Sequence, residues 1–291
     1  MSNQPPYLPT NMGITNTVLL VSNNISSGPY AFQLPQCNIT NNPYSGGGYV
    51  GTTGTYGLLN CIAIQNGAIS AAVWFYLPPG GYGVILSFQS PYQYPNSEIN
   101  RIAWLYVLPG GILGVGDWTS PGYWGIKAPI SPGWHMAVVE EWASSTSGPY
   151  YLALYLDGQF IGQTSTTYLP DMFGYESNFP YDNIGTGYAG PGFGYPSVNW
   201  WFFNGTIAYV ALYNRVLTTS EVLAIYQGIR ITSGLVAEYV GNNYNPSTGV
   251  WADSSGNNYH ASTVVAGQYP PRGCVLWPVG VSGYWINWPT C

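Results

Sequence analysis

From about Gly46 onward, the chain alternates short apolar stretches with clusters of Gly, Pro, Ser and Asn. Ten of these stretches have the length and the β-branched and aromatic content of strands. They are Tyr49–Thr53, Asn60–Gln65, Ser70–Leu77, Gly83–Gln89, Arg101–Leu108, Ile112–Asp117, Trp134–Trp142, Tyr150–Leu156, Gln159–Thr164 and Gly205–Tyr213. Strands at this spacing predict an all-β chain that folds as an antiparallel β-sandwich or barrel.

Asp157-Gly158 marks the clearest turn in this pattern, because it separates the apolar stretches Tyr150–Leu156 and Gln159–Thr164. Asp and Gly supply the two positive-φ positions that a type I′ turn requires. We therefore predict that the two stretches pair as a β-hairpin.

Residues 218–227 predict the one short helix of the chain. Thr218 is a suitable N-cap, Glu221 stands three residues later as a capping box requires, and Gly228 follows as the C-terminal stop. We expect this helix to lie across the end of the sandwich.

Composition divides the chain into three parts. Residues 1–45 are rich in Pro, Asn and Ser, which predicts an extended N-terminal arm that contacts a neighbouring subunit. Residues 46–230 hold the predicted strands and helix and form the β-sandwich. Residues 231–291 form a C-terminal β extension that completes or decorates the sandwich, since Leu235–Val240 alternates like a strand with one buried face.

An ordered series of three motifs runs through the predicted sandwich. The motifs are Trp134–Val139, the turn Leu154–Gly158, and Asn204–Leu217 leading into Ser220-Glu221-Val222. Their order and spacing resemble the concanavalin A-like, laminin-G-like jelly rolls, a superfamily found in surface and virion proteins. The resemblance covers roughly residues 46–228 and implies a jelly-roll β-sandwich.

The tail departs from the order of that family. In the family, a segment similar to Gly234–Tyr239, followed by one similar to Trp251–Ala261, usually opens the domain, whereas here it follows the helix. The tail either begins a truncated second unit, completes its own sandwich by permutation, or completes a neighbour's sandwich. The resemblance implies a place beside the strand Ile207–Tyr213, in the same subunit or an adjacent one.

The chain of 291 residues is poor in charge: only 5% of its residues are charged, whereas a soluble domain usually carries about 25%. Hydrophobic residues make up 46% of it, which excludes intrinsic disorder. The 38 Gly and 24 Pro interrupt every apolar run before it could span a membrane. Five Lys and Arg cannot neutralise a run of phosphates, so nucleic acid is not an expected partner.

The charge deficit also bears on the surroundings of the protein. Acid denaturation acts mostly by protonating carboxylates that are paired in the native state, and eleven Asp and Glu with five Lys and Arg leave few such pairs. We predict an acid-stable surface protein whose melting temperature changes little from pH 7 to pH 3. A low-charge adhesin from a neutral medium is the alternative.

Four cysteines, Cys37, Cys61, Cys274 and Cys291, indicate disulfides, because there is no Cys-x-x-Cys pair and only two His accompany them. Three connectivities remain open, and sequence proximity favours Cys37–Cys61 with Cys274–Cys291. Disulfides imply an oxidising compartment.

An exterior location agrees with the N-glycosylation sequons at Asn24, Asn38 and Asn204. The sequence begins with Met1 and shows no secretory leader. We therefore expect a protein that is made in the cytoplasm and later meets the outside, as virion proteins do.

No catalytic constellation is recognisable. Glu140 and Glu141 are adjacent on a predicted strand, so they point to opposite faces and cannot act on one bond. His135 has no nucleophile motif nearby, and Pro191 follows the Gly-rich string at 185–190 where a phosphate-binding helix would begin. We predict no enzyme, no metal site and no cofactor. Calcium stays an alternative, because lectin-like jelly rolls often bind it, although residues 253–257 lack dense carboxylates.

Aromatic residues in or beside loops could stack on sugar rings. The candidates are Trp118, Tyr123, Trp124, Trp200 and Trp201, together with Tyr92 and Tyr94. Packing in the core and at interfaces is the alternative role for most of them in so aromatic a chain.

These observations predict a structural protein of an exposed assembly. The first choice is a virion surface protein, capsid or appendage, of a thermoacidophilic archaeal virus, which self-assembles, contacts other structural proteins of the particle and attaches to host glycans. The alternative is a cell-surface, lectin-like carbohydrate-binding module or an extracellular filament subunit. In every case the expected location is the virion surface or the extracellular space.

Overall fold

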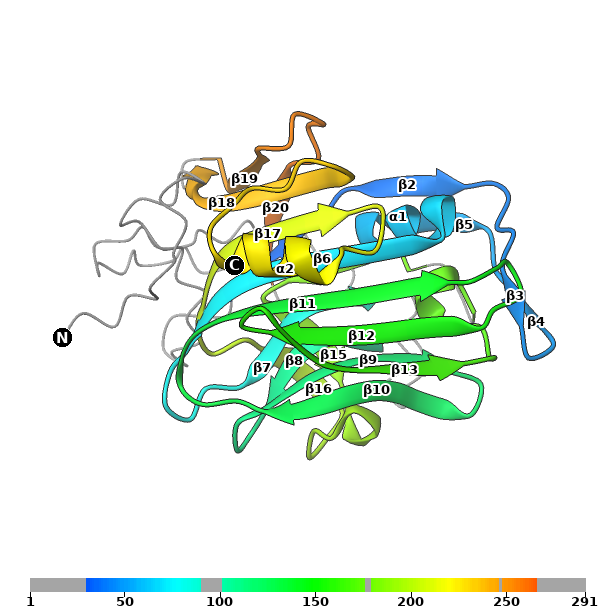
Figure 1. Ribbon diagram of the computed structural model, residues 1–291, viewed down its shortest axis with the longest axis horizontal. Coiled ribbons are helices and arrows are strands. Elements are labelled where there is room, and N and C mark those ends of the chain that lie inside the picture. The colour runs from blue at the N-terminus through cyan, green and yellow to red at the C-terminus, as the bar shows by residue number, and fades with distance from the viewer. Residues whose placement is uncertain (1–29, 90–100, 176–178, 246–247, 266–291) are drawn as a thin grey trace.

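The protein's structure is a computed structural model that describes residues 30–89, 101–175, 179–245 and 248–265. Most of its strands join into one antiparallel sheet that bends back on itself into two layers (Figure 1). The first layer holds β6 (Ala68–Leu77), β11 (Gly133–Ala143), β12 (Tyr150–Leu156), β13 (Gln159–Thr166), β17 (Thr206–Tyr213), β18 (Leu235–Asn245) and β19 (Val250–Asp253). The second layer holds β7 (Gly83–Gln89), β8 (Arg101–Leu108), β9 (Ile112–Thr119), β10 (Gly122–Pro129), β14 (Tyr181–Ile184), β1 (Tyr30–Gln33) and β20 (Ala261–Val265). This architecture confirms the predicted fold class, an all-β sandwich of the jelly-roll type.

Several short elements complete the described fold. They are β2 (Gln36–Ile39) paired with β5 (Gly54–Gly57), β3 (Ser45–Gly46) paired with β4 (Tyr49–Val50), β15 (Thr186–Ala189) paired with β16 (Asn199–Phe202), the helices α1 (Leu58–Asn66) and α2 (Thr219–Tyr226), and the 3-10 turns η3 (Asp171–Phe173) and η4 (Pro191–Phe193). No helix in the described part of the chain is long and apolar enough to cross a membrane.

The two free edges of the bent sheet, β10 and β13, lie against each other. Trp124 of β10 donates from Nε1 to the Thr164 hydroxyl of β13 at 3.3 Å. A methyl group of Ile126 lies close to Gly162, 3.8 Å from where a Cβ of that residue would be. Side chains therefore cover edges that would otherwise present unpaired backbone groups to another chain.

The central strand β6 is buried on both faces. Ile69, Val73 and Phe75 point into the core between the layers, while Ala72 and Trp74 point outward into a second cluster of buried residues. A strand with two buried faces reads as one continuous apolar run, which is the pattern of residues 68–77.

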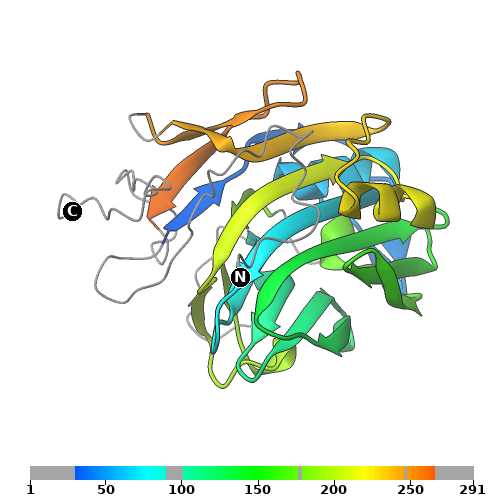
Figure 2. The same ribbon diagram turned by 60° about the vertical axis from the view of Figure 1, so that its left-hand side comes forward.

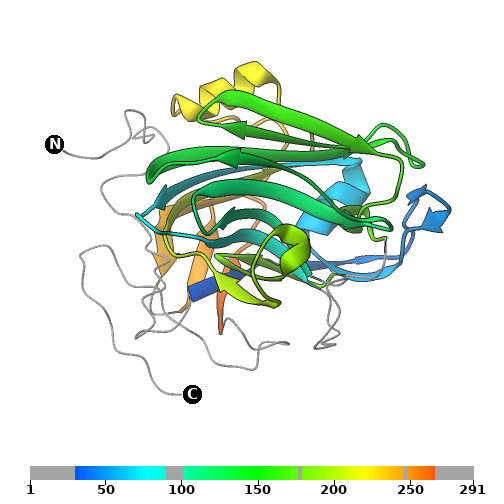
Figure 3. The ribbon, with the colours of Figure 1, turned by 90° about the horizontal axis from the view of Figure 1, so that it is seen from below.

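Helix α2 supplies the cover for that outer cluster (Figure 3). The helix begins at the predicted residue. The Thr218 side chain accepts from the Glu221 backbone N–H, and the Glu221 side chain accepts from the Thr218 backbone N–H. Tyr226 stacks on Trp74 with ring centroids 5.6 Å apart. The helix thus lies on the outer face of the first layer, and the expectation that it crosses the end of the sandwich is wrong, because the apolar outer face of β6 and β11 offers its partners.

The predicted hairpin between β12 and β13 is confirmed. Asp157 and Gly158 have φ angles of 52° and 78°, as a type I′ turn requires. Asp157 also serves the neighbouring strand, since its carboxylate accepts from the Met136 backbone N–H at 2.9 Å.

The predicted strand Asn60–Gln65 is wrong: these residues belong to helix α1. Leu58–Ile64 are buried on every side of this helix, so the sequence shows a short apolar run without the periodicity that separates a helix from a strand. Asp182 of β14 caps the helix from across the fold, accepting from the Leu59 N–H at 2.5 Å. Gly57 leaves room for that carboxyl group, because a Cβ there would lie 2.2 Å from the Asp182 Cγ.

Part of the predicted N-terminal arm belongs to the sheet of the same chain. β1 pairs with β14 on one side and with β20 on the other (Figure 2), and β2 pairs with β5. Tyr30–Gln33 therefore lies within the second layer, and this segment does not extend towards a neighbour. Residues 1–29 of the arm lie outside the described residues.

The described tail completes the chain's own sandwich, which decides between the three alternatives. β18 pairs antiparallel with β17, with Tyr239 opposite Val210, at the place expected beside Ile207–Tyr213. Glu238 of β18 is almost fully buried, forms an ion pair with Arg230 at 2.7 Å and accepts from the Tyr209 hydroxyl. From β18 the sheet continues through β19 and β20 to β1 in the second layer.

Trp251 of β19 is fully buried where the two layers join. Its ring packs against Phe32 of β1 and Tyr239 of β18, with centroids 4.9 and 5.7 Å away, and its Nε1 donates to the Val240 carbonyl at 2.7 Å. One side chain of the tail thus contacts strands of both layers.

We expect Trp251→Ala to lower the free energy of unfolding by about 3–5 kcal/mol, because it leaves a large cavity where the layers meet. Urea unfolding followed by circular dichroism measures the change. Tyr259→Ala is the control, since the Tyr259 ring is exposed and its loss should change stability by less than about 0.5 kcal/mol. Equal stability of both variants and the wild type would show that the tail is not part of the core.

Cys37 and Cys61 form a disulfide with a Cα–Cα distance of 6.2 Å, in agreement with the favoured pairing. It links β2 to α1 across 24 residues of sequence. Cys274 and Cys291 lie outside the described residues.

Peptide mapping without reducing agent should recover a Cys37–Cys61 peptide pair from the native protein. Replacing both cysteines with serine should lower the free energy of unfolding by about 3 kcal/mol, through loss of the loop constraint on the unfolded chain. Free thiols at both positions in the native protein would refute the bond.

Candidate binding site

The outer face of the second layer, where aromatic residues could have met a ligand, is covered by the chain itself. Residues 186–202, which contain β15, η4 and β16, lie over β7 and β8. Phe193 packs against Tyr123 and Tyr106 with ring centroids 5.2 and 5.9 Å away, and Trp118 adjoins it at 6.2 Å. This face is therefore an aromatic packing surface in the described structure.

The sugar-stacking candidates fall in three different surroundings. Trp118 and Tyr123 belong to the cluster around Phe193, and Trp201 stacks on Tyr195 at 4.6 Å beside it. Trp124 faces the edge strand β13, as described above. Trp200 is half-buried and meets Tyr188 edge to face at 5.6 Å. The structure does not bring the five together, and a role in sugar stacking stays a prediction.

The other predicted positions are partly described. Asn38 is exposed on β2 and its side-chain oxygen accepts from the Thr55 hydroxyl, whereas Asn204 is half-buried. Asn24, Tyr92 and Tyr94 lie outside the described residues. Glycosylation at the two described sequons also stays a prediction.

The residues considered for catalysis have structural partners. Glu140 accepts from the Leu217 backbone N–H at 2.8 Å, whereas Glu141 points to the opposite face and accepts from the indole of Trp104 at 2.9 Å. His135 bridges the Asp157 carboxylate and the Ser131 carbonyl, each at 2.8 Å. The described part of the chain holds no group of three His, Cys, Asp or Glu side chains that could bind a metal ion.

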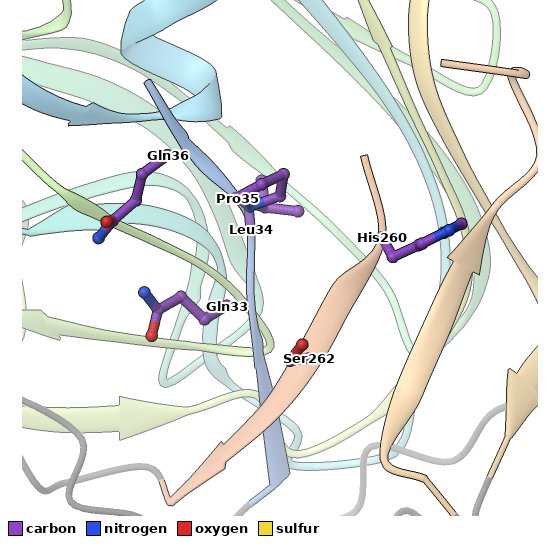
Figure 4. Close-up of a pocket in the computed structure, with 6 residues that line it drawn as sticks. All are labelled: Gln33, Leu34, Pro35, Gln36, His260 and Ser262. Atoms are coloured by element: carbon purple, nitrogen blue, oxygen red, sulfur yellow. The ribbon is translucent and has the colours of Figure 1, made fainter. Parts of the chain in front are cut away.

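One hollow in the described structure is an open pocket of about 370 Å³ between the β1–β2 connection and β20 (Figure 4). Its lining residues are Gln33, Leu34, Pro35, Gln36, His260 and Ser262. Gln33 stands opposite Ser262 in the β1–β20 pairing, so the pocket exists only where the two ends of the described chain meet.

The polar groups of the pocket are amide, hydroxyl and imidazole groups, and some of them already have partners within the fold. Gln36 donates from Nε2 to the Pro180 carbonyl at 2.6 Å, which leaves its amide oxygen as an acceptor. His260 accepts the Asp253 backbone N–H at its Nδ1 (3.0 Å), which leaves Nε2 as the second hydrogen-bonding atom of the ring. Ser262 and Gln33 can each donate and accept. The lining of the pocket thus combines hydrogen-bond donors and acceptors with the apolar side chains of Leu34 and Pro35.

Sequence reasoning did not identify this pocket. Its residues come from 33–36 and 260–262, and neither segment carries a motif. Only the pairing of β1 with β20 brings them together, and that pairing could not be read from the sequence.

Comparisons with known proteins give likeness of fold only. No family model and no curated protein matches the chain. Among solved structures, it is similar to a candidate carbohydrate-binding protein from Bacteroides ovatus, with 11% identity and a TM-score of 0.45 over 81% of this chain and 58% of that one. It is also similar to a pentraxin from Limulus polyphemus (15%, TM-score 0.41, 72% and 81%) and to the CBM40 of the Ruminococcus gnavus IT-sialidase (15%, TM-score 0.43, 67% and 97%). The chain therefore spans little more than half the length of the Bacteroides protein.

Proposed function

We propose that the chain is a non-catalytic, lectin-like module that binds an uncharged glycan in the pocket of Gln33, Gln36, His260 and Ser262. The observation that carries this proposal is the chemistry of that pocket, whose lining residues include amide, imidazole and hydroxyl groups. A sugar hydroxyl can donate one hydrogen bond and accept another, and amide, imidazole and hydroxyl side chains provide partners for both.

The charge distribution supports an uncharged ligand. Among the described residues, Arg215 and Arg230 form ion pairs with Glu221 and Glu238, and Lys127 lies over the ring of Tyr123. None of these cations lines the pocket. An acidic sugar would need a guanidinium or ammonium group to hold its carboxylate.

The setting that we propose is the outside of a cell or particle. The Cys37–Cys61 disulfide supports an oxidising compartment, and the low charge content supports acidic surroundings. The virion surface of a thermoacidophilic archaeal virus, where the chain would self-assemble and attach to host glycans, is the finer form of this proposal.

A glycan array probed with the protein at pH 4 and pH 7 tests the binding function. We expect selective binding of neutral glycans, and the double variant Gln33→Ala with His260→Ala should bind about tenfold more weakly, because each lost hydrogen bond contributes about 0.5–1.5 kcal/mol. Gln36 is left unchanged because it also bonds to the Pro180 carbonyl within the fold.

Gln227→Ala, an exposed change at the end of α2, is the matched control and should bind like the wild type. Absence of binding to any glycan, or equal binding by the double variant, would refute the pocket. Electron microscopy of the same sample at pH 4 addresses the setting: regular particles or filaments favour a structural subunit, and dispersed monomers favour a cell-surface module.

A further inference from the structure

Two carboxyl groups meet in the core between the layers. Asp117 of β9 and Glu141 of β11 are both fully buried, and they lie close enough for each carboxyl group to change the pKa of the other. Asp171, the first residue of η3, is a third fully buried acid close enough to act on Glu141 through its charge. Burying three carboxyl groups in an apolar core costs free energy unless hydrogen bonds or protonation replace their contacts with water.

Neutral hydrogen-bond donors supply part of that compensation. Asp117 accepts from the backbone N–H groups of Trp118 (2.6 Å) and Met172 (2.8 Å), so its carboxyl group joins β9 to η3. Glu141 accepts from the indole N–H of Trp104 at 2.9 Å. Trp104 reaches it because β8 has an extra residue opposite β7, where Ala103 pairs with Ser87 but Leu105 already pairs with Leu86.

No cation takes part among the described residues. The helix α1 faces η3 with Asn60, whose amide donates to the carbonyl groups of Asp171 and Met172. Tyr56 is the other titratable group beside Asp171, and its phenol is neutral because burial raises its pKa. Two adjacent carboxylates without a cation repel each other, so the pair retains at least one proton.

We propose that this carboxyl pair is a proton-dependent link between the layers: while protonated it joins β9, β11 and η3, and loss of its protons near neutral pH weakens the fold. The protein is then more stable in acid than at neutral pH, and this proposal replaces the expectation from the sequence that the melting temperature changes little from pH 7 to pH 3. The link involves none of the pocket residues and stands or falls independently of glycan binding.

The direction of the pH effect follows from where the protons are held. Burial raises the pKa of Asp117 to about 7, and burial with the charge of Asp117 raises that of Glu141 well above its usual range. The folded protein then binds more protons than the unfolded chain between about pH 4 and pH 7. Each extra proton raises the unfolding equilibrium constant about tenfold for every unit by which pH increases within that window.

The other described groups with shifted pKa values mostly act in the same direction. Burial raises the pKa of Glu140 to about 7 and raises that of Asp182 well above its usual range. Burial alone would lower the pKa of His135, but the bond to Asp157 outweighs it and the net shift is upward, so its contribution is present in acid and fades as pH rises. Glu221 opposes them: the ion pair with Arg215 lowers its pKa to about 2, and that contribution is lost only as pH falls below about 4.

Thermal unfolding from pH 4 to pH 8 tests the proposal. The wild type should melt at the highest temperature near pH 4–5 and at progressively lower temperatures towards pH 8. Glu141→Gln keeps the shape, lets Oε1 accept from Trp104 and lets Nε2 donate to Asp117 without a shared proton. In this variant the unfolding equilibrium constant should rise about tenfold less per pH unit than in the wild type, because one proton fewer is lost. The variant should also melt at a higher temperature than the wild type at pH 8.

Glu221→Gln is the matched control: because the Arg215 ion pair lowers the pKa of Glu221 to about 2, its removal should leave the slope between pH 5 and pH 8 unchanged. Should Glu141→Gln fail to fold, carboxyl-carbon NMR of the wild type reads the protonation of Asp117 and Glu141 directly. A melting temperature that is flat or rises from pH 5 to pH 8, or titration of both acids below pH 5, would overturn the proposal.

Discussion

The pairing of the C-terminal strands with both layers is the constraint on which the rest of the structure depends. β18 extends the first layer from β17, and β20 extends the second layer through β1, so the bent sheet is continuous only through residues 235–265. The ion pair of Arg230 with the nearly buried Glu238 and the packing of Trp251 hold this junction. The candidate pocket depends on the same pairing, because its two walls come from the paired strands.

Sequence reasoning succeeded where a local signal determined local structure. Asp157-Gly158 specifies the turn through backbone conformation, and Thr218 with Glu221 specifies the start of α2 through side-chain bonds to the backbone. It failed where the determinant is distant in sequence. Helix α1 is buried on all sides, so its sequence lacks an amphipathic pattern, and its cap comes from Asp182 on another strand.

From the sequence, the type of the candidate site could be predicted but its position in the fold could not. The sequence indicates a lectin-like fold with stacking aromatics, but residues 186–202 lie over the second layer and make Phe193, Tyr195 and Trp201 partners of the rings that looked available. Aromatic content alone cannot tell a ring that waits for a ligand from one that packs on its own chain. Likewise, the small number of acids predicts that stability is unaffected by low pH, whereas the position of Asp117 beside Glu141 is a reason for stability to be higher at low pH.

The strand order also determines when the molecule can fold during its synthesis. β1 emerges from the ribosome early, yet its partners are residues 181–184 and 261–265, so it has no sheet to join until most of the chain has been made. Contacts between such distant residues slow folding, since a long loop must close before they form. The first layer can assemble around β6, β11 and β12 while translation continues, but closure of the sandwich must wait for the last described strand. A nascent chain therefore carries an open sheet edge for most of its synthesis, and only the finished protein protects it.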